Sequence, residues 1–272
     1  MKFGKPCWMT MLDVMWCGSV LAMTSILRSY LKNWTITQTL YRKGRVSVLR
    51  DCRKTQDYFE RYLREQETRI VRFSKKLEEL VSDQKPLPKI QQCHRFLSSL
   101  MHDKFYAQYS LGCEKSLLMQ TFQAYLLHVQ TQGSLTYQEV LDTLSLAVLF
   151  QVDLKSTLPA AYIPQDALLQ TLYSYQNGRT EDAPEDSKLL FPDTTSVFME
   201  TLQEKRSAED LREYIQSQWY EDNKESAWFD SDKRTDDTYC GYWCFEGAAV
   251  ALIRKFERNT FSNCRFFPVD ML

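Results

Sequence analysis

The stretch YCGYWCFEGAAVALIRKF, from Tyr239 to Phe256, decides how the chain is expected to fold. Its first half is rich in aromatic residues, and its second half contains Gly247, Ala248, Ala249 and Ala251. Small side chains let a neighbouring backbone approach closely, so the stretch predicts a central helix that begins at a collar of large rings. A proline in the following FFPVDML segment ends the helical pattern. No catalytic signature occurs in it.

Upstream of this stretch, hydrophobic residues recur at helical spacing. Over residues 55–82 the stripe consists of Tyr58, Tyr62, Ile70, Phe73, Leu77 and Leu80. Charged residues occupy most of the remaining positions, which predicts a long amphipathic helix. The Lys85-Pro-Leu-Pro88 segment is expected to end it, and the next helix, over about 90–105, is expected to run back antiparallel.

Further helices are predicted over about 113–130, 137–150, 166–175, 194–204 and 208–219. Thr136 with Glu139 and Ser207 with Asp210 have the spacing of a helix-capping pair. The helix over 137–150 is apolar on several sides, so we expect neighbours to bury it.

These patterns predict an all-α fold, a helical bundle of antiparallel helix pairs in two closely packed halves. The chain has only 8 glycines and 8 prolines in 272 residues, and no Asn-Gly turn joins two alternating segments. Two prolines between residues 157 and 165 interrupt the pattern and mark the predicted boundary. The expected divisions are an unassigned N-terminal extension at 1–49, an N-terminal helical region at 50–156 and a C-terminal helical region at 157–272.

The N-terminal extension contains an apolar stretch at residues 14–27 that follows Lys2 and Lys5. Asp13 interrupts it, no clean cleavage site follows, and about fourteen residues are too few to span a bilayer. A packed or frayed helix is therefore favoured over a signal peptide, and an upstream start codon would explain the extension.

The cysteines and histidines do not indicate a metal or a nucleophilic site. Eight cysteines in 272 residues is too low a density for a disulfide scaffold, so reduced thiols and a cytoplasmic location are expected. Cys240, Cys244 and Cys264 would need a fourth zinc ligand, but all three histidines lie far upstream. A nucleophilic pair such as His94 with Cys113 could form only if the fold happened to bring the two residues together. Structural roles are therefore expected for the histidines.

The catalytic motifs that can be tested are absent, and no cofactor is expected. Glu246 is the one unusual acid, because it lies in the most apolar helix of the chain. A buried carboxylate needs a partner. A tyrosine hydroxyl, Arg254 or Arg258 is the expected one, in a structural role rather than a functional one.

The segment WYEDNKESAWFDSDKRTDD, residues 219–237, combines seven carboxylates and four aromatic residues with only three basic residues. It is either a solvated loop with its aromatic residues folded inward or a face that binds a basic protein. The residues alone favour neither. The candidate partner-binding residues are Glu221, Asp222, Trp228, Asp230, Asp232, Asp236 and Asp237.

Two parts of the chain resemble the PoNi family of bacterial immunity proteins, which neutralise a DNA-degrading toxin delivered by neighbouring cells. RDCRKTQDYFERYLREQETRIVRFSKKLEEL (residues 50–80) and FYAQYSLGCEKSLL (residues 105–118) are similar to the family's N-terminal region. YCGYWCFEGAAVALIRKF and the terminal FFPVDML are similar to its C-terminal region.

The resemblance implies an all-helical protein without catalytic activity, whose partner is a cognate DNase toxin exported by type VI or another contact-dependent secretion system. A nuclease presents a basic surface to phosphate, and an acidic protein can occupy that surface. Direct binding to nucleic acid or to a membrane is not expected. Two alternatives remain at this point, a helical adaptor for an unrelated protein and an enzyme with an unrecognised site.

Overall fold

The computed structural model describes residues 48–155, 157–158, 160–178 and 188–272. The predictions for residues 1–47, including the apolar stretch at 14–27, lie outside the described residues. Within these ranges every regular element is helical and no strand is present, as the sequence predicts. None of the described helices is both long enough and apolar enough to cross a bilayer.

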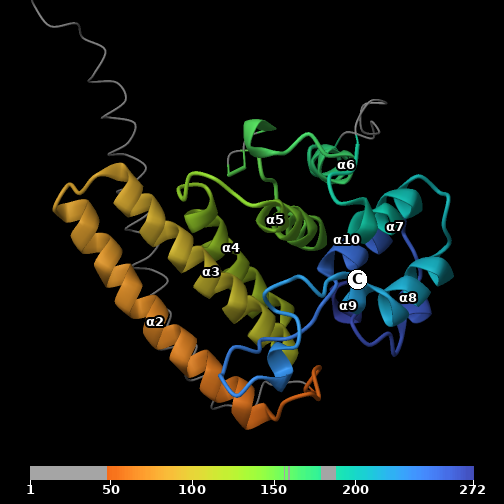
Figure 1. Cartoon of the computed structure of the whole chain (residues 1–272), viewed down its shortest axis with the longest axis horizontal. Coiled ribbons are helices and arrows are strands. Elements are labelled where there is room, and N and C mark those ends of the chain that lie inside the picture. The colour runs from red at the N-terminus through yellow and green to blue at the C-terminus, as the bar shows by residue number, and fades with distance from the viewer. Residues whose placement is uncertain (1–47, 156, 159, 179–187) are drawn as a thin grey trace, which may run out of the picture.

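The elements follow each other in a simple order (Figure 1). The α-helices are α2 (Gln56–Ser82), α3 (Leu87–Leu111), α4 (Lys115–Val129), α5 (Tyr137–Phe150), α6 (Ala167–Gln176), α7 (Pro192–Leu202), α8 (Ala208–Ser217), α9 (Trp219–Asp222) and α10 (Phe245–Ile253). Short 3₁₀ turns are η1 (Ala160–Tyr162), η2 (Ser231–Lys233), η3 (Arg258–Phe261) and η4 (Val269–Met271).

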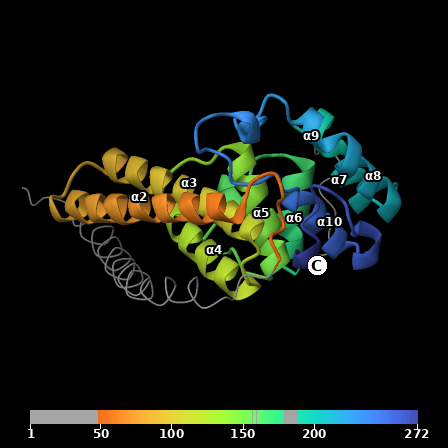
Figure 2. The ribbon, with the colours of Figure 1, turned by 90° about the horizontal axis from the view of Figure 1, so that it is seen from below.

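The first two helices, α2 and α3, form a long antiparallel pair that lies side by side in both views (Figures 1 and 2). The Thr55 hydroxyl caps α2 by accepting a hydrogen bond from the backbone of Tyr58, and Phe59, Leu63 and Ile70 are buried. α3 begins three residues earlier than the expected residue 90. A proline is tolerated in the first helical turn, where its missing N–H has no partner to lose, so Pro88 lies inside α3 instead of before it.

The fourth predicted helix has its expected bounds as α5, between α10 and α6 (Figure 1). Thr136 and Glu139 form the predicted capping box at its start, and Ser207 and Asp210 form the other one at α8. Every residue from Val140 to Phe150 is buried. The expectation that neighbours bury this helix is confirmed.

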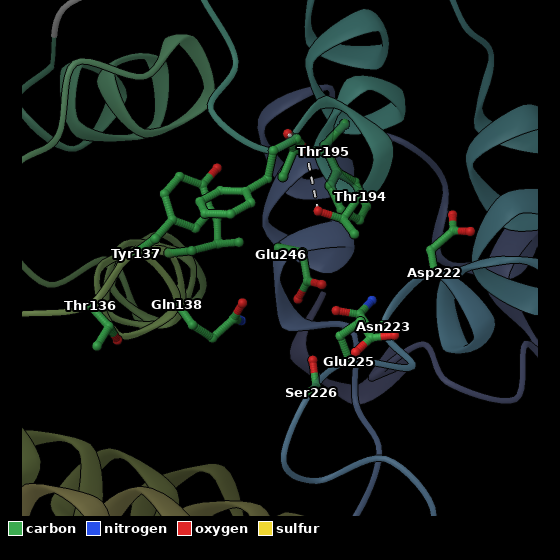
Figure 3. A pocket seen from close by; sticks show the side chains of 13 residues that line it. Thr136, Tyr137, Gln138, Thr194, Thr195, Asp222, Asn223, Glu225, Ser226 and Glu246 are labelled. Carbon is green, nitrogen blue, oxygen red and sulfur yellow. Dashed lines mark hydrogen bonds between the residues drawn. The ribbon is translucent and has the colours of Figure 1, made fainter.

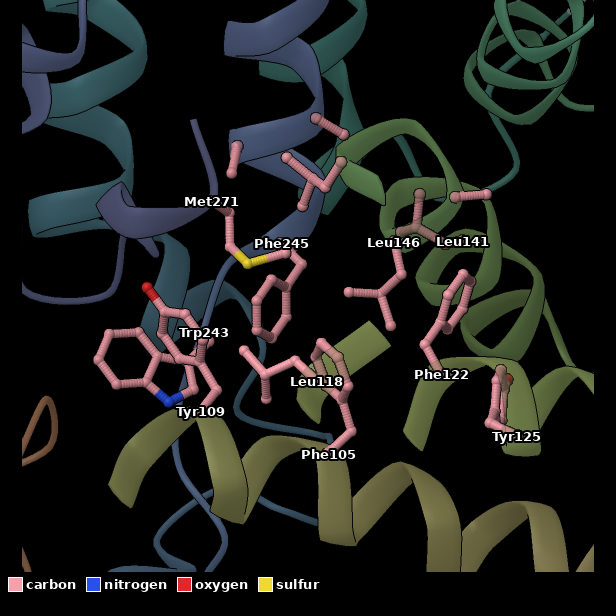
Figure 4. Packing of buried hydrophobic residues seen from close by; sticks show 14 of the residues in the cluster. Phe105, Tyr109, Leu118, Phe122, Tyr125, Leu141, Leu146, Trp243, Phe245 and Met271 are labelled. Carbon is pink, nitrogen blue, oxygen red and sulfur yellow. The ribbon is translucent and has the colours of Figure 1, made fainter. Parts of the chain in front are cut away.

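The predicted central helix is α10, and its small residues serve close packing. Ala248 to Ala251 are completely buried, and a Cβ atom on Gly247 would lie 2.5 Å from Cδ1 of Ile215 on α8. The predicted aromatic collar is also buried: Trp243 is 6% exposed and Phe245 is 0% exposed. The Phe245 ring meets Phe105 and Tyr109 of α3, with ring centroids 5.5 and 5.3 Å apart (Figure 4).

The segment before α10 is joined to the end of α3 through Ser110. Its hydroxyl donates to the carbonyl of Cys240 at 2.8 Å and accepts from the Trp243 indole N–H at 2.9 Å. Gly241 lies between them with φ of +127°, a conformation that glycine adopts without strain. Ser110 and Cys240 belong to the N-terminal and C-terminal regions that the sequence indicates, so this contact ties the two together.

Buried hydrophobic residues from both regions form one cluster. The division at residue 157 stays a prediction.

Candidate functional site

The acidic segment 219–237 is anchored by its aromatic residues. Trp219 is 4% exposed and stacks on Trp228, with ring centroids 5.5 Å apart. Tyr220 stacks on Phe266 at 5.3 Å and also contacts Tyr242. The rings therefore fold inward, as expected of a solvated loop, while several carboxylates remain at the surface.

The seven candidate partner-binding residues fall into two sets. Glu221, Asp222, Asp236 and Asp237 are exposed, and Asp237 forms an ion pair with Arg61 of α2 at 3.2 Å. Trp228, Asp230 and Asp232 are half-buried. These three take part in the internal structure of the segment.

The half-buried aspartates accept hydrogen bonds from tyrosines. The Tyr220 hydroxyl donates to Asp230 at 2.8 Å, and the Tyr242 hydroxyl donates to Asp232 at 2.7 Å. Asp230 also pairs with Lys233 at 2.6 Å. The bonds from Lys233 and Tyr220 lower the pKa of Asp230, so this carboxylate is already engaged.

Two cavities lie beneath the acidic segment, and Glu246 of α10 lines both. The larger has a volume of about 400 Å³, between the first turn of α5, α7, and the end of α9 with the loop after it (Figure 3). The smaller, about 130 Å³, lies towards α3 and includes His102 and Asp142. Gln138 and Asn223 also line both cavities.

Glu246 is 7% exposed and accepts a hydrogen bond from the Trp219 indole at 2.7 Å. The expected partners, a tyrosine hydroxyl, Arg254 or Arg258, are wrong. Arg254 pairs with Glu204 and Arg258 with Asp270. Glu246 is in the first turn of α10 and Arg254 caps its other end, about 12 Å away along a helix axis, so the two side chains cannot meet.

The environment of Glu246 favours its neutral form. Burial, together with the negative charge of Asp142, raises the pKa of Glu246 to about 7, against the hydrogen bonds from its own backbone, Trp219 and Cys244. The protonated carboxyl is therefore populated near neutral pH.

His102 supplies a positive charge in the smaller cavity. It lies 3.1 Å from Asp142 and 3.7 Å from Asp103. Burial opposes its charge, but the hydrogen bonds and charges of Asp103 and Asp142 outweigh burial and raise the pKa of His102 to about 10. His102 is thus a fixed cation at neutral pH and is not poised to act as a general base.

The other two histidines contact each other instead of a cysteine. The Nδ1 atoms of His94 on α3 and His128 on α4 are 3.0 Å apart. Burial lowers the pKa of His94 to about 4 and, together with the His94 charge, that of His128 to about 3. Both rings are therefore neutral at physiological pH. Their contact with each other is consistent with the structural role that the sequence predicts.

The described residues include no group of three or more histidines, cysteines, aspartates or glutamates arranged to hold a metal ion. Among the residues that the structure describes, Cys52, Cys93, Cys240, Cys244 and Cys264 are free thiols. Burial raises the pKa of the Cys240, Cys244 and Cys264 thiols, which favours the protonated thiol over the thiolate that binds metals.

Much of this site has no local signal in the sequence. Gln138, Asn223, Glu225 and the α3 residues His102 and Asp103 come together only through the packing of separate helices. The one signal was the presence of a carboxylate, Glu246, inside an apolar helix.

Comparison with known proteins gives two findings. Residues 164–271 match the sequence model of a family described as PoNe immunity proteins (PoNi), C-terminal. The structure is similar to the crystal structure of protein PA2201 from Pseudomonas aeruginosa, with a TM-score of 0.68 and 15% identity over 89% of this chain and 95% of that one. At this identity the likeness concerns the fold alone. No curated protein matches the chain.

Proposed function

We propose that this chain, whose residues 164–271 are the C-terminal domain of a PoNe immunity protein, binds and neutralises a cognate PoNe toxin. The family match is the observation that carries the proposal. It agrees with the resemblance at residues 239–272, and members of the family are immunity proteins rather than enzymes. The cognate toxin is the partner that the family implies.

The proposed mechanism is occlusion of a basic surface on a DNase toxin by the acidic segment 219–237. The segment lies within the matched domain, and Glu221, Asp222 and Asp236 are exposed. A nuclease must attract phosphate with positive charge, and complementary negative charge speeds encounter with such a surface. Once bound, the immunity protein excludes DNA from the same surface.

The compartment and the toxin's route are further parts of the proposal. A DNase acts where the DNA is, so we place the complex in the cytoplasm of a cell that receives the toxin by type VI or other contact-dependent secretion. Free cysteines such as Cys52 and Cys240 are compatible with a reducing compartment.

The test begins with the product of the neighbouring open reading frame as the candidate toxin. It should form a stable complex with this protein, and co-expression should restore growth to cells that produce it. A nuclease from that gene that neither binds this protein nor is neutralised by it would contradict the proposal.

A charge-reversal variant then tests the surface. The triple variant E221K/D222K/D236K changes exposed carboxylates that form no ion pair with any residue that the structure describes. Because rim charges act mainly on encounter, we expect association at low salt to slow by about tenfold or more, and the difference to shrink as salt rises. The control is E65K/E79K/D83K, which makes the same charge change on exposed positions of α2 and the residue that caps it. Glu79 and Asp83 form exposed ion pairs with Lys76 and Lys85, and pairs of this kind contribute little to stability. Equal slowing in both variants would indicate net charge rather than a specific face, and unchanged association in the first would show that the toxin binds elsewhere.

A further inference from the structure

We propose that the larger cavity beside Glu246 is a socket for one arginine or lysine side chain of the partner. The inference rests on the proposed function, since it places the centre of the toxin interface at a particular carboxylate. The exposed acids would steer the toxin, and the socket would hold it.

The first argument is the charge of the cavity wall. Asp222, Glu225 and Glu246 contribute three carboxylates. Among the described residues that line this cavity there is no lysine, arginine or histidine. His102 lines only the smaller cavity, where it already lies between Asp103 and Asp142. The larger cavity therefore has an excess of negative charge that a cation from outside would neutralise.

The second argument is the placement of Glu246. Its carboxylate points from α10 into the space between Gln138 on one side and Asn223 with Glu225 on the other (Figure 3). One of its oxygens accepts the Trp219 indole hydrogen bond, which fixes the side chain in this direction. A cation at this point would replace the solvation that burial removes, because a buried carboxylate is stabilised by a paired charge.

The third argument is the shape and the apolar part of the wall. Tyr137 and Phe191 pack together with ring centroids 4.6 Å apart, and Leu141 and Phe198 complete this side. Long basic side chains bury their methylene stems on apolar surface and keep the charged group on polar partners. A cavity of about 400 Å³ with aromatic walls and an acid at its base suits such a side chain.

The fourth argument is continuity with the surface. Asp222 and Glu225 line the cavity and are also exposed, so its rim is part of the acidic segment. A basic toxin surface that approaches this segment would bring its cations directly to the opening. The pocket and the acidic face then act as one interface, with the tightest contact at its centre.

The direct test needs no toxin. N-acetyl-arginine amide serves as the probe, and the neutral isostere N-acetyl-citrulline amide is its control. The Trp219 indole N–H, bonded to Glu246, is an NMR reporter next to the proposed cation site. We expect saturable shifts of this signal with a dissociation constant of about 1 mM for the arginine probe and no saturation with citrulline. Equal responses to both probes, or no saturable response to arginine, would overturn the inference.

Glu246→Gln tests the carboxylate itself, because glutamine keeps the size and can still accept the Trp219 hydrogen bond. Arginine-probe binding should weaken at least tenfold in this variant. Glu65→Gln, at an exposed position of α2, is the matched control and should bind as the parent does. Unchanged probe binding in Glu246→Gln would refute the role of Glu246.

The same variants in the toxin complex separate the socket from the general function. Loss of a buried charge pair acts on dissociation, so the Glu246→Gln complex should dissociate about thirtyfold faster or more, with nearly unchanged association. If the parent binds the toxin and Glu246→Gln dissociates at the same rate, the socket is wrong while the immunity function stands. If the parent does not bind the toxin, the immunity function fails, and the arginine titration still decides whether the cavity binds a cation.

Discussion

Replacing Gly241 by alanine should disrupt the hydrogen bonds of Ser110 that connect the N-terminal and C-terminal regions. Gly241 has φ of +127°, and an added Cβ would lie 2.6 Å from the Trp243 indole nitrogen and closer still to the Ser110 hydroxyl. Backbone strain of this kind costs about 1–3 kcal/mol. The clash also displaces the two hydrogen bonds of Ser110, at about 1 kcal/mol each. The free energy of unfolding should therefore fall by about 3–5 kcal/mol.

Three comparison variants isolate the cause. Gly178 also has a positive φ, +68°, but a Cβ there meets no atom of the described residues within 4 Å, so Gly178→Ala should cost only the backbone strain, about 1 kcal/mol. Ser110→Ala should cost about 2–3 kcal/mol, because the Trp243 N–H and the Cys240 carbonyl lose a partner. The double variant Gly241→Ala/Ser110→Ala has no hydroxyl for the new methyl group to clash with. Its loss of unfolding free energy should therefore be smaller than the sum of the two single losses by about 1 kcal/mol or more.

Urea unfolding followed by far-UV circular dichroism measures all four variants against the parent. A Gly241→Ala protein within 1 kcal/mol of the parent would refute the close approach at Ser110. Additive single costs would show that the methyl group and the hydroxyl do not meet.

Three further predictions concern the core, the thiols and the buried acid. Phe245→Ala and Trp243→Ala should each lower the free energy of unfolding by about 3–5 kcal/mol, because each leaves a large cavity in a packed core. If both variants melt at the same temperature as the parent, these rings are not core residues. Among the described residues Cys52, Cys93, Cys240, Cys244 and Cys264 are free thiols and no group of side chains is arranged to hold a metal ion. We therefore predict a melting temperature that neither reductant nor chelator changes, and a large drop on adding either would contradict this. Burial raises the pKa of Glu246 from 4.5 to about 7, so the folded state loses this proton at a higher pH than the unfolded state does. Its contribution to stability is full below pH 4.5 and is lost as pH rises to about 7, so the stability of the parent relative to Glu246→Gln should fall by about 3 kcal/mol over that interval, and a difference that is constant with pH would refute the raised pKa. The lowered pKa values of His94 and His128 act in the opposite direction in the same interval, and this contribution cancels in the comparison because both proteins contain the pair.

Local patterns predicted the helices well because helix formation depends on neighbours three and four residues away. The bounds of α5 follow from the Thr136 capping box and an unbroken apolar run, which need no tertiary information. The expected helix over 208–219 ends earlier, at Ser217, and the chain resumes as the short α9. Trp219 turns inward there to reach Glu246, 27 residues away, and no local pattern encodes that contact.

Contacts that join distant parts of the chain were less predictable than the helices. Asp51 accepts a hydrogen bond from Tyr239, and Arg50 pairs with Asp270, although these partners are separated by 188 and 220 residues. The acidic composition of residues 219–237 was visible in the sequence. The division between exposed acids such as Glu221 and acids held by tyrosines, such as Asp230 and Asp232, was not, because Tyr220 and Tyr242 can select their partners only in the folded chain.

Glu246 costs the folded protein stability at neutral pH, since burial raises the free energy of its ionised form. A glutamine could accept the same Trp219 hydrogen bond without that cost, so the indole alone does not account for a carboxylate at this position. Departures from the locally most stable choice are expected at functional sites. A cation supplied by a binding partner would stabilise the ionised form and lower the pKa of Glu246. The complex would then no longer carry the free-energy cost of an unpaired buried carboxylate. On this reasoning, binding of the partner should release protons near pH 7, and the Glu246→Gln variant should bind without that release. Calorimetric titration in buffers of different ionisation enthalpy measures this proton release, and equal release in both proteins would assign it to another group.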